Sequence, residues 1–142
     1  MATVRRETRI RRSADDVWAL AGDPARLHEW FPGMVSSTVD GSVRTITTET
    51  GIEMPEEIVT VDPILRRFQY RITSRLVQQH LGVIDVFDLG DGSSLVAYST
   101  DAEPDAMALI IGGATGGALA ELRRQLEDGS PRHPTGNSKG NT

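Results

Sequence analysis

Glu56, His80 and Tyr98 are the side chains of this sequence that could transfer a proton in a reaction. His80 begins an apolar stretch, and an unperturbed histidine pKa of about 6.5 suits a general acid or base. The other interpretation of His80 is a hydrogen-bonded surface residue at the end of a strand. Acid–base catalysis needs a reacting group within hydrogen-bond reach of the side chain. Whether these residues can act as acids or bases therefore depends on where the fold places them.

Glu56 shares one face of the extended segment 53–61 with Ile58 and Thr60. A lone carboxylate on the inward face would be costly to bury. Arg44, on the neighbouring predicted strand, could pair with it there. The alternative is that Glu56 faces solvent, as one of several acids in this part of the chain. The pattern of residues leaves both interpretations open.

The absence of cysteine excludes several other chemistries. With no cysteine and only three histidines, the chain offers no disulfide framework, no thiolate zinc site, no iron–sulfur site and no cysteine nucleophile. The run Gly112–Gly117 lacks the Gly-Lys-Ser/Thr ending of a phosphate-binding loop. The serine-hydrolase and zinc-protease motifs are also absent. The sequence therefore predicts neither a metal nor a cofactor.

Length and charge indicate one globular domain. The chain has 142 residues, of which 38% are hydrophobic and 25% are charged. Residues 1–12 carry a net charge of +4, whereas residues 13–127 carry −10, and an acidic body disfavours nucleic-acid partners. No uncharged stretch is long enough for a membrane span. The first residues also lack the apolar core of a secretory signal. We therefore expect a cytoplasmic protein.

The spacing of apolar residues and turn signals predicts mostly strands. Residues 4–12 alternate between charged and less polar positions, which is typical of a half-exposed strand. Ser13 could cap a short helix, and Pro24 could begin a second one that ends near Trp30. Six further strands are predicted between turn signals, at 34–39, 42–49, 53–61, 65–74, 80–89 and 93–102.

Residues 105–127 have the apolar periodicity of one long helix. A sheet of seven mostly hairpin-linked, antiparallel strands needs one apolar face covered, and this helix is long enough to cover it. We predict an α+β fold in which a curved sheet grips the helix, as one domain over residues 1–127. Residues 128–142 contain no large apolar side chain and are predicted to be a disordered tail.

Four glycines interrupt the predicted long helix, namely Gly112, Gly113, Gly116 and Gly117. Glycine inside a helix costs roughly 1 kcal/mol relative to alanine, so four of them need a reason. One hypothesis is that they thin the helix to enlarge a cavity or let it bend for entry of a ligand. The alternative is close packing of helix against sheet with no ligand involved.

An ordered set of residues resembles the START-like helix-grip superfamily, which includes birch-pollen-allergen relatives and polyketide cyclase/dehydratase-like proteins. The resemblance spans about residues 3–127. The matching features are Ile10, the segment 13–18, Trp30-Phe31-Pro32, Gly41, Arg44, Glu56, Asp62, the segment 66–72, the hairpin at 92–98 and Gly117 through Leu122. Tyr98 departs from the pattern, because such proteins often have tryptophan there.

The resemblance implies a cavity between sheet and long helix that holds a small apolar, amphipathic or polycyclic molecule. Binding or transport of such a ligand is the first functional expectation. A polyketide cyclase/dehydratase-like enzyme that uses acid–base residues of the cavity is the second, and an interaction module with a filled core is the third. The residues expected to contact the ligand are Trp30, Phe31, Arg44, Glu56, Tyr70, Tyr98, Ile111 and Thr115.

Overall fold

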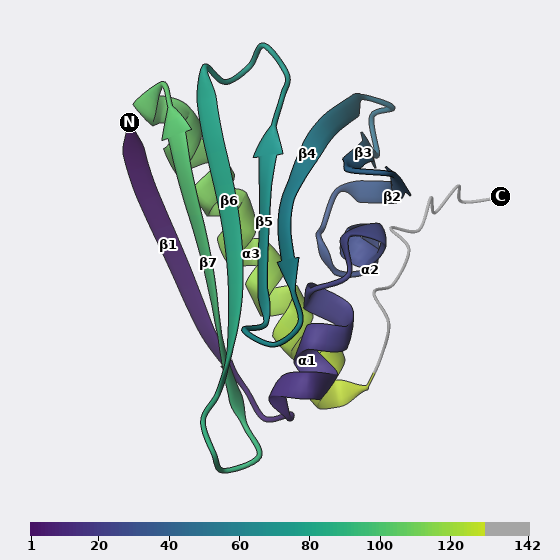
Figure 1. Ribbon diagram of the computed structural model, residues 1–142, viewed down its shortest axis with the longest axis vertical. Helices are drawn as coiled ribbons and strands as arrows, with labels where there is room; N and C mark the ends of the chain where they lie inside the picture. Colours follow the sequence, from purple (N-terminus) through teal and green to yellow (C-terminus); the bar gives the residue numbers. More distant parts are fainter. Residues whose placement is uncertain (130–142) are drawn as a thin grey trace, which may run out of the picture.

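The computed structural model describes residues 1–129, which form a seven-stranded sheet and a long helix with short helical segments at one end (Figure 1). The predicted tail begins at residue 128. Asp128 is the last residue of the long helix, and Gly129 follows it in the left-handed conformation that commonly ends helices. The rest of the predicted tail lies outside the described residues.

Helical segments follow the first strand at both predicted places, and the second of them consists of a 3₁₀ turn that continues into a short α-helix. Ser13 caps the first helix, because its Oγ accepts a hydrogen bond of 3.2 Å from the Asp16 N–H. Asp23 caps the next segment in the same way through the Ala25 N–H, at 2.9 Å. The elements are β1 (Ala2–Ile10), α1 (Ala14–Ala21), the 3₁₀ segment η1 (Pro24–Arg26) and α2 (Leu27–Trp30).

The remaining six strands lie close to their predicted positions, and each is antiparallel to its neighbours. Consecutive strands from β2 to β7 pair as hairpins, and β1 pairs with β7, so the order across the sheet is β1-β7-β6-β5-β4-β3-β2. The strands are β2 (Met34–Asp40), β3 (Val43–Thr48), β4 (Glu53–Asp62), β5 (Arg67–Ile72), β6 (Gln79–Asp88) and β7 (Ser94–Glu103).

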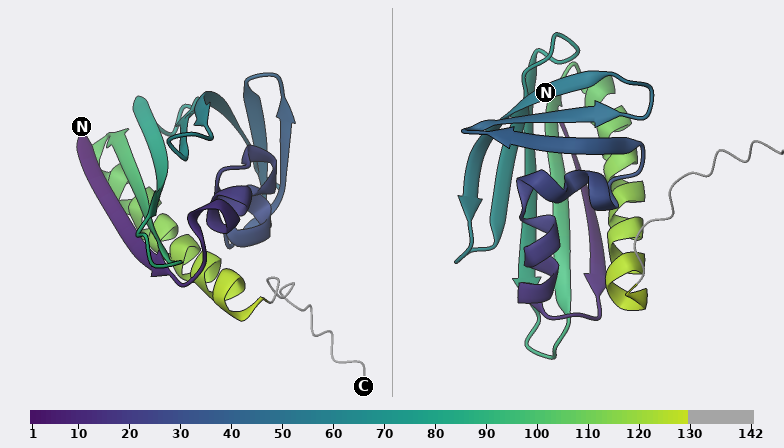
Figure 2. Two further views of the ribbon diagram at one scale, coloured as in Figure 1. Left: turned by 60° about the horizontal axis from the view of Figure 1, so that its bottom comes forward. Right: turned by 90° about the vertical axis from the view of Figure 1, so that its right-hand side faces the viewer.

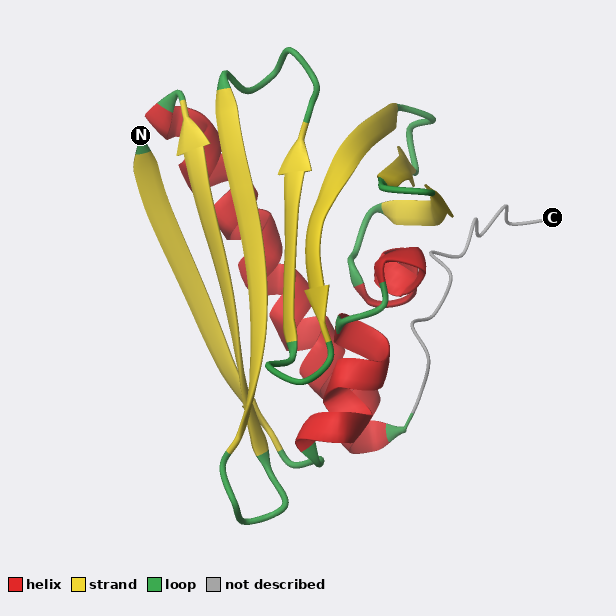
Figure 3. Ribbon diagram, viewed as in Figure 1, coloured by secondary structure: helices red, strands yellow, loops and turns green. Residues whose placement is uncertain are grey.

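The long helix, α3 (Asp105–Asp128), lies along the concave face of the sheet (Figures 2 and 3). Its contacts with the sheet are mainly to β1 and β7. The sheet then curves away from α3 towards β2, and α1 and α2 close the end near the C-terminus of α3. This is the predicted helix-grip α+β fold.

The core of the described residues joins α3, the short helices and the middle strands in one cluster. Among its side chains that are 1% exposed or less, Trp30, Tyr98 and Phe68 are the largest apolar ones. The apolar face of α3 contributes Ala118, Leu119 and Leu122 to the same cluster. Packing is therefore dense around the C-terminal half of α3, and the space that remains lies towards its N-terminal half.

Candidate functional site

A cavity of about 150 Å³ lies between the sheet and the N-terminal half of α3. Three polar side chains line it, namely Glu56, Tyr70 and Tyr98. Its lining residues Leu76 and Ile110 are more than 60% exposed, so the cavity reaches the surface between the β5–β6 loop and α3. The apolar lining consists of Leu27, Phe31, Met34, Ile46, Met54, Ile72, Leu76, Val77, Met107, Ile110, Ile111 and Ala114.

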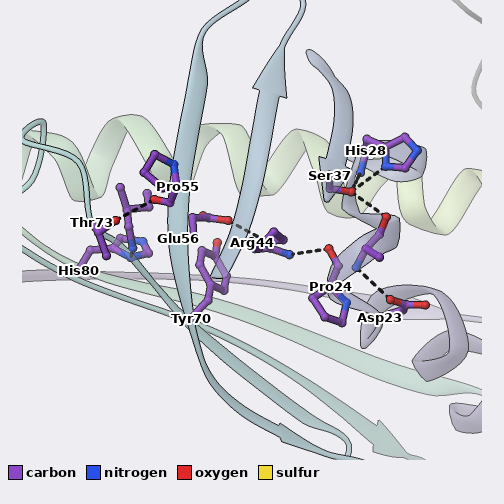
Figure 4. Close-up of polar contacts among 12 residues, drawn as sticks. Asp23, Pro24, His28, Ser37, Arg44, Pro55, Glu56, Tyr70, Thr73 and His80 are labelled. Atoms are coloured by element: carbon purple, nitrogen blue, oxygen red, sulfur yellow. Dashed lines mark hydrogen bonds and ion pairs between the residues drawn. The ribbon is translucent and has the colours of Figure 1, made fainter. Parts of the chain in front are cut away.

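A buried ion pair forms the polar end of this cavity (Figure 4). Arg44 on β3 lies directly opposite Glu56 on β4, and its Nε donates a hydrogen bond of 2.8 Å to Glu56 Oε1. The side chains are 1% and 4% exposed. The Arg44 guanidinium also lies over the rings of Tyr70 and Phe68, at 4.7 and 5.0 Å from their centroids. Arg44 therefore positions Glu56 without lining the cavity itself.

The carboxyl group of Glu56 is less acidic than an ordinary glutamate. Burial raises the pKa of Glu56, and the charge and hydrogen bond of Arg44 offset only part of that rise. The structure thus selects the buried interpretation of Glu56 over the solvent-facing one. A carboxylate with a raised pKa on a cavity wall can accept a hydrogen bond or a proton from a bound molecule.

Two tyrosines complete the polar end. The hydroxyl groups of Tyr70 on β5 and Tyr98 on β7 are hydrogen-bonded to each other across β6, and their rings meet edge to face. Burial raises the pKa of both phenols. Both hydroxyls therefore keep their protons at neutral pH and act as hydrogen-bond donors or acceptors.

His80 lies outside this cavity, although it is only 5% exposed. Its Nδ1 accepts a 3.0 Å hydrogen bond from the Ile72 N–H, and its Nε2 has no partner among the described residues. The ring contacts Tyr70 with centroids 5.4 Å apart. Burial lowers the pKa of His80 to about 4, and the negative charge of the nearby Asp101 offsets part of that shift. His80 is therefore neutral at pH 7 and is neither a surface residue nor a wall of the cavity.

His80 makes the stability of the protein pH-dependent. Because the pKa of His80 is about 4 in the folded protein and about 6.5 in the unfolded chain, the unfolded chain binds more protons between these pH values. The free energy of unfolding should therefore fall as the pH drops from 7 to 5, by about 2 kcal/mol from this residue alone. Urea unfolding at both pH values should show this loss in the original protein and a correspondingly smaller loss in His80→Gln. Equal losses in the two proteins would contradict the assignment.

Five of the eight expected ligand contacts line the cavity, whereas Trp30, Arg44 and Thr115 do not reach it. Phe31, Glu56, Tyr70, Tyr98 and Ile111 line it. Trp30 is fully buried behind the wall, with its ring 6.0 Å from Phe31 and 6.3 Å from Tyr98, because its size suits the dense core next to α3. Thr115 is 1% exposed and its Oγ1 donates to the Gly112 carbonyl at 2.9 Å, so its polar group is satisfied within α3.

The four helix glycines do not line the cavity either. A Cβ on Gly112 would lie 2.4 Å from Val4 Cγ1, so this glycine lets α3 approach β1 closely. Gly116 faces the Arg6 side chain, while Gly113 and Gly117 face open space. The geometry of Gly112 matches the close-packing alternative, and none of the four enlarges the cavity.

Most of the apolar wall was not predicted, although the sequence contains a signal for part of it. Ile46, Met54 and Ile72 lie two positions along the chain from Arg44, Glu56 and Tyr70, respectively. Side chains two positions apart share one face of a strand. On α3, Met107 and Ala114 share a face with Ile111. Leu76 and Val77 had no such signal, because they lie in the loop between β5 and β6.

One helix among the described residues, α3, is long and apolar enough to cross a membrane by length and composition. The core helix of a globular domain passes the same test. In this structure α3 packs along β1 and β7, with Ala108, Leu119 and Leu122 among its buried side chains. No group of metal-ligating side chains occurs within residues 1–129.

The fold is shared with many solved structures. The protein XoxI from Bacillus cereus is 25% identical, with a TM-score of 0.84 over 90% of this chain and 97% of that one. A START superfamily protein from Mycobacterium smegmatis is 15% identical, with a TM-score of 0.74 over 90% of this chain and 99% of that one. Norcoclaurine synthase from Thalictrum flavum, solved with dopamine and hydroxybenzaldehyde, is 21% identical, with a TM-score of 0.67 over 89% of this chain and 84% of that one.

No curated protein matches this chain. A family model, however, matches residues 1–127, which include every strand and nearly all of α3. Its description is polyketide cyclase / dehydrase and lipid transport. The matched region contains the whole cavity and its polar end. This chain therefore belongs to the polyketide cyclase/dehydrase and lipid transport family.

Proposed function

We propose that this protein binds a small apolar or amphipathic molecule in the cavity between the sheet and α3. The observation that supports this most strongly is the composition of the cavity wall. Twelve apolar residues surround about 150 Å³ of space, and the three polar residues gather at one end. Binding sites for small molecules commonly combine an apolar wall with a few polar groups that fix orientation. A filled core, the third expectation from the sequence, would not leave such a cavity.

The experiment compares two substitutions on the same helix. Ile111 lines the cavity, whereas Leu109, two residues away, is 67% exposed and does not. Tryptophan at 111 should fill the cavity, and tryptophan at 109 should leave it open. Native mass spectrometry of the protein purified from its own cells should find a retained small molecule in the original protein and in Leu109→Trp. Ile111→Trp should lose it.

Two results would contradict ligand binding in this cavity. One is a retained molecule that Ile111→Trp binds as well as Leu109→Trp does. The other is the absence of any cavity-dependent ligand, both in the purified protein and in titrations with small apolar compounds. Thermal unfolding of both variants checks that each is folded, because an added indole can strain a packed helix.

A cyclase-like enzyme is the second candidate, and Glu56 is the observation that favours it. Of the three acid–base residues predicted from the sequence, Glu56 and Tyr98 line the cavity and His80 does not. Glu56 has a raised pKa there, as a general base of a carbon acid needs, and a tyrosine hydroxyl could donate a hydrogen bond to the oxyanion that forms. Incubating the retained molecule with fresh protein distinguishes the two candidates, since a binder returns it unchanged. The cytoplasmic location remains a prediction from the sequence.

A further inference from the structure

We propose that the cavity selects an uncharged, single-ring alcohol or phenol whose hydroxyl group lies between Glu56 and the Tyr70–Tyr98 pair. This inference rests on the proposed function and specifies the chemical class of the ligand. It follows from three properties of the cavity: its size, its net charge, and the hydrogen-bonding groups that remain available at its polar end.

The size of the cavity fits one ring. Its volume is about 150 Å³. An apolar cavity of about 150 Å³ engineered in another protein binds benzene, which sets the scale for a single six-membered ring. Fused-ring compounds would not fit without opening the wall. A short substituent could extend between Leu76 and Ile110, where the cavity reaches the surface.

The charge of the cavity fits a neutral ligand. Arg44 and Glu56 form a buried pair at 2.8 Å, so their charges compensate each other. The described residues place no other charged side chain on the cavity wall. An ionised ligand would have to give up its hydration without gaining a counter-charge, which is strongly unfavourable.

The hydrogen-bonding groups fit a hydroxyl. Arg44 Nε is the one hydrogen-bond donor to Glu56 within residues 1–129, and it occupies Oε1, so the carboxylate can accept a further hydrogen bond from the cavity. In the Tyr70–Tyr98 pair, one hydroxyl donates to the other, and the accepting hydroxyl keeps its own hydrogen for another partner.

The cavity wall at the polar end therefore offers one strong acceptor, on Glu56, and one donor, on the tyrosine pair. The guanidinium carbon of Arg44 lies 4.7 Å from the centroid of the Tyr70 ring, and Nε of the same guanidinium donates to Glu56, so Glu56 and Tyr70 flank one group (Figure 4). A ligand hydroxyl can donate to the carboxylate and accept from the phenol at once. A carbonyl, ether or nitrile could only accept, which would leave the second carboxylate oxygen of Glu56 without a donor, and a hydrocarbon would satisfy neither group.

A titration with matched compounds tests this. The probes are p-cresol, p-tolunitrile, toluene, p-toluate and 2-naphthol, which differ in hydrogen bonding, charge or ring number. By isothermal titration calorimetry at pH 7, p-cresol should bind about tenfold or more tightly than toluene and p-tolunitrile. p-Toluate should not bind, and 2-naphthol should bind more weakly than p-cresol. Ile111→Trp should abolish p-cresol binding and Leu109→Trp should keep it.

Glu56→Gln adds a test of the group responsible. A glutamine that bonds to Arg44 through its carbonyl would present an NH₂ donor to the cavity, so the preference for p-cresol over p-tolunitrile should shrink at least tenfold. If this variant is unfolded, the relative affinities of the probes for the original protein decide whether the cavity selects a hydroxyl group. Equal affinity for toluene and p-cresol, or tighter binding of 2-naphthol or p-toluate, overturns the inference.

The inference and the proposed function fail differently. If toluene binds as well as p-cresol and Ile111→Trp abolishes both, the cavity binds ligands but the hydroxyl selection is wrong. A retained cellular molecule that is charged or polycyclic would have the same meaning. If no probe binds and no molecule is retained, the proposed function is wrong as well.

Discussion

Arg44→Met is expected to lower the free energy of unfolding by about 3–5 kcal/mol at pH 7, as measured by urea unfolding. Methionine fills similar space, but it leaves the Glu56 carboxylate buried at 4% exposure with no positive partner. Removing one member of a buried pair costs far more than the pair contributes, because the remaining charge is uncompensated. The loss should be smaller at low pH, where Glu56 can take up a proton and become neutral.

Two controls separate the buried charge from other effects of the substitution. Arg67 on β5 makes an ion pair of the same 2.8 Å length with Asp85, but its side chain is 44% exposed, so Arg67→Met should cost about 1 kcal/mol or less. The double variant Arg44→Met/Glu56→Leu removes both charges and should recover most of the lost stability. A double variant as unstable as Arg44→Met would show that packing of the guanidinium on Phe68 and Tyr70 dominates instead.

The strands and their order could be predicted from the sequence because both depend on local signals. Short turns such as Gly90-Asp91-Gly92 join consecutive strands, and a chain of hairpins fixes both direction and neighbours. The one pairing that no hairpin fixes is β1 with β7. This pairing is consistent with the alternation of charged and less polar residues over 4–12, since one face of β1, with Arg5, Glu7 and Arg9, is exposed.

The polar end of the cavity could be predicted only in part. The alternation of side chains along β4 predicts that Glu56 and Ile58 share one face of the strand. It does not show which face is inward, because the opposite face also carries acidic residues, Glu53 and Glu57. The register of the β3–β4 hairpin decides it, since it sets Arg44 directly opposite Glu56. The hydrogen bond between Tyr70 and Tyr98 could not be predicted from local signals, because β6 separates their strands in the sheet.

The glycine that shapes the cavity wall is Gly82, which lies in a strand and not in the glycine-rich helix. The four glycines of α3 are unusual for a helix, yet they lie outside the cavity. Gly82 stands in β6 directly opposite Tyr70 of β5. Its missing side chain leaves the room that the Tyr70 ring occupies, a relation that exists only once the two strands are paired. Sequence periodicity cannot show such a contact.

Gly82→Ala is therefore expected to lower the free energy of unfolding by about 3 kcal/mol, at the upper end of the usual cost of overpacking. A Cβ at this position would lie 2.5 Å from Tyr70 Cζ and 2.9 Å from its hydroxyl oxygen. The ring cannot retreat freely, because it stacks on Phe68 and its hydroxyl bonds to Tyr98. Displacing it should also disturb Glu56 and Arg44, so the affinity for any cavity ligand should fall with the stability.

Gly113→Ala is the matched control, since it adds the same methyl group where nothing lies within 4 Å. Alanine in the exposed middle of α3 should raise stability by up to about 1 kcal/mol, because it restricts the unfolded chain and favours the helix. Urea unfolding at pH 7 should thus move the two variants in opposite directions from the original protein, and p-cresol titration should weaken in Gly82→Ala alone. If Gly82→Ala instead keeps both stability and affinity, the Tyr70 ring is not fixed by its neighbours, and the polar end of the cavity can rearrange around a ligand.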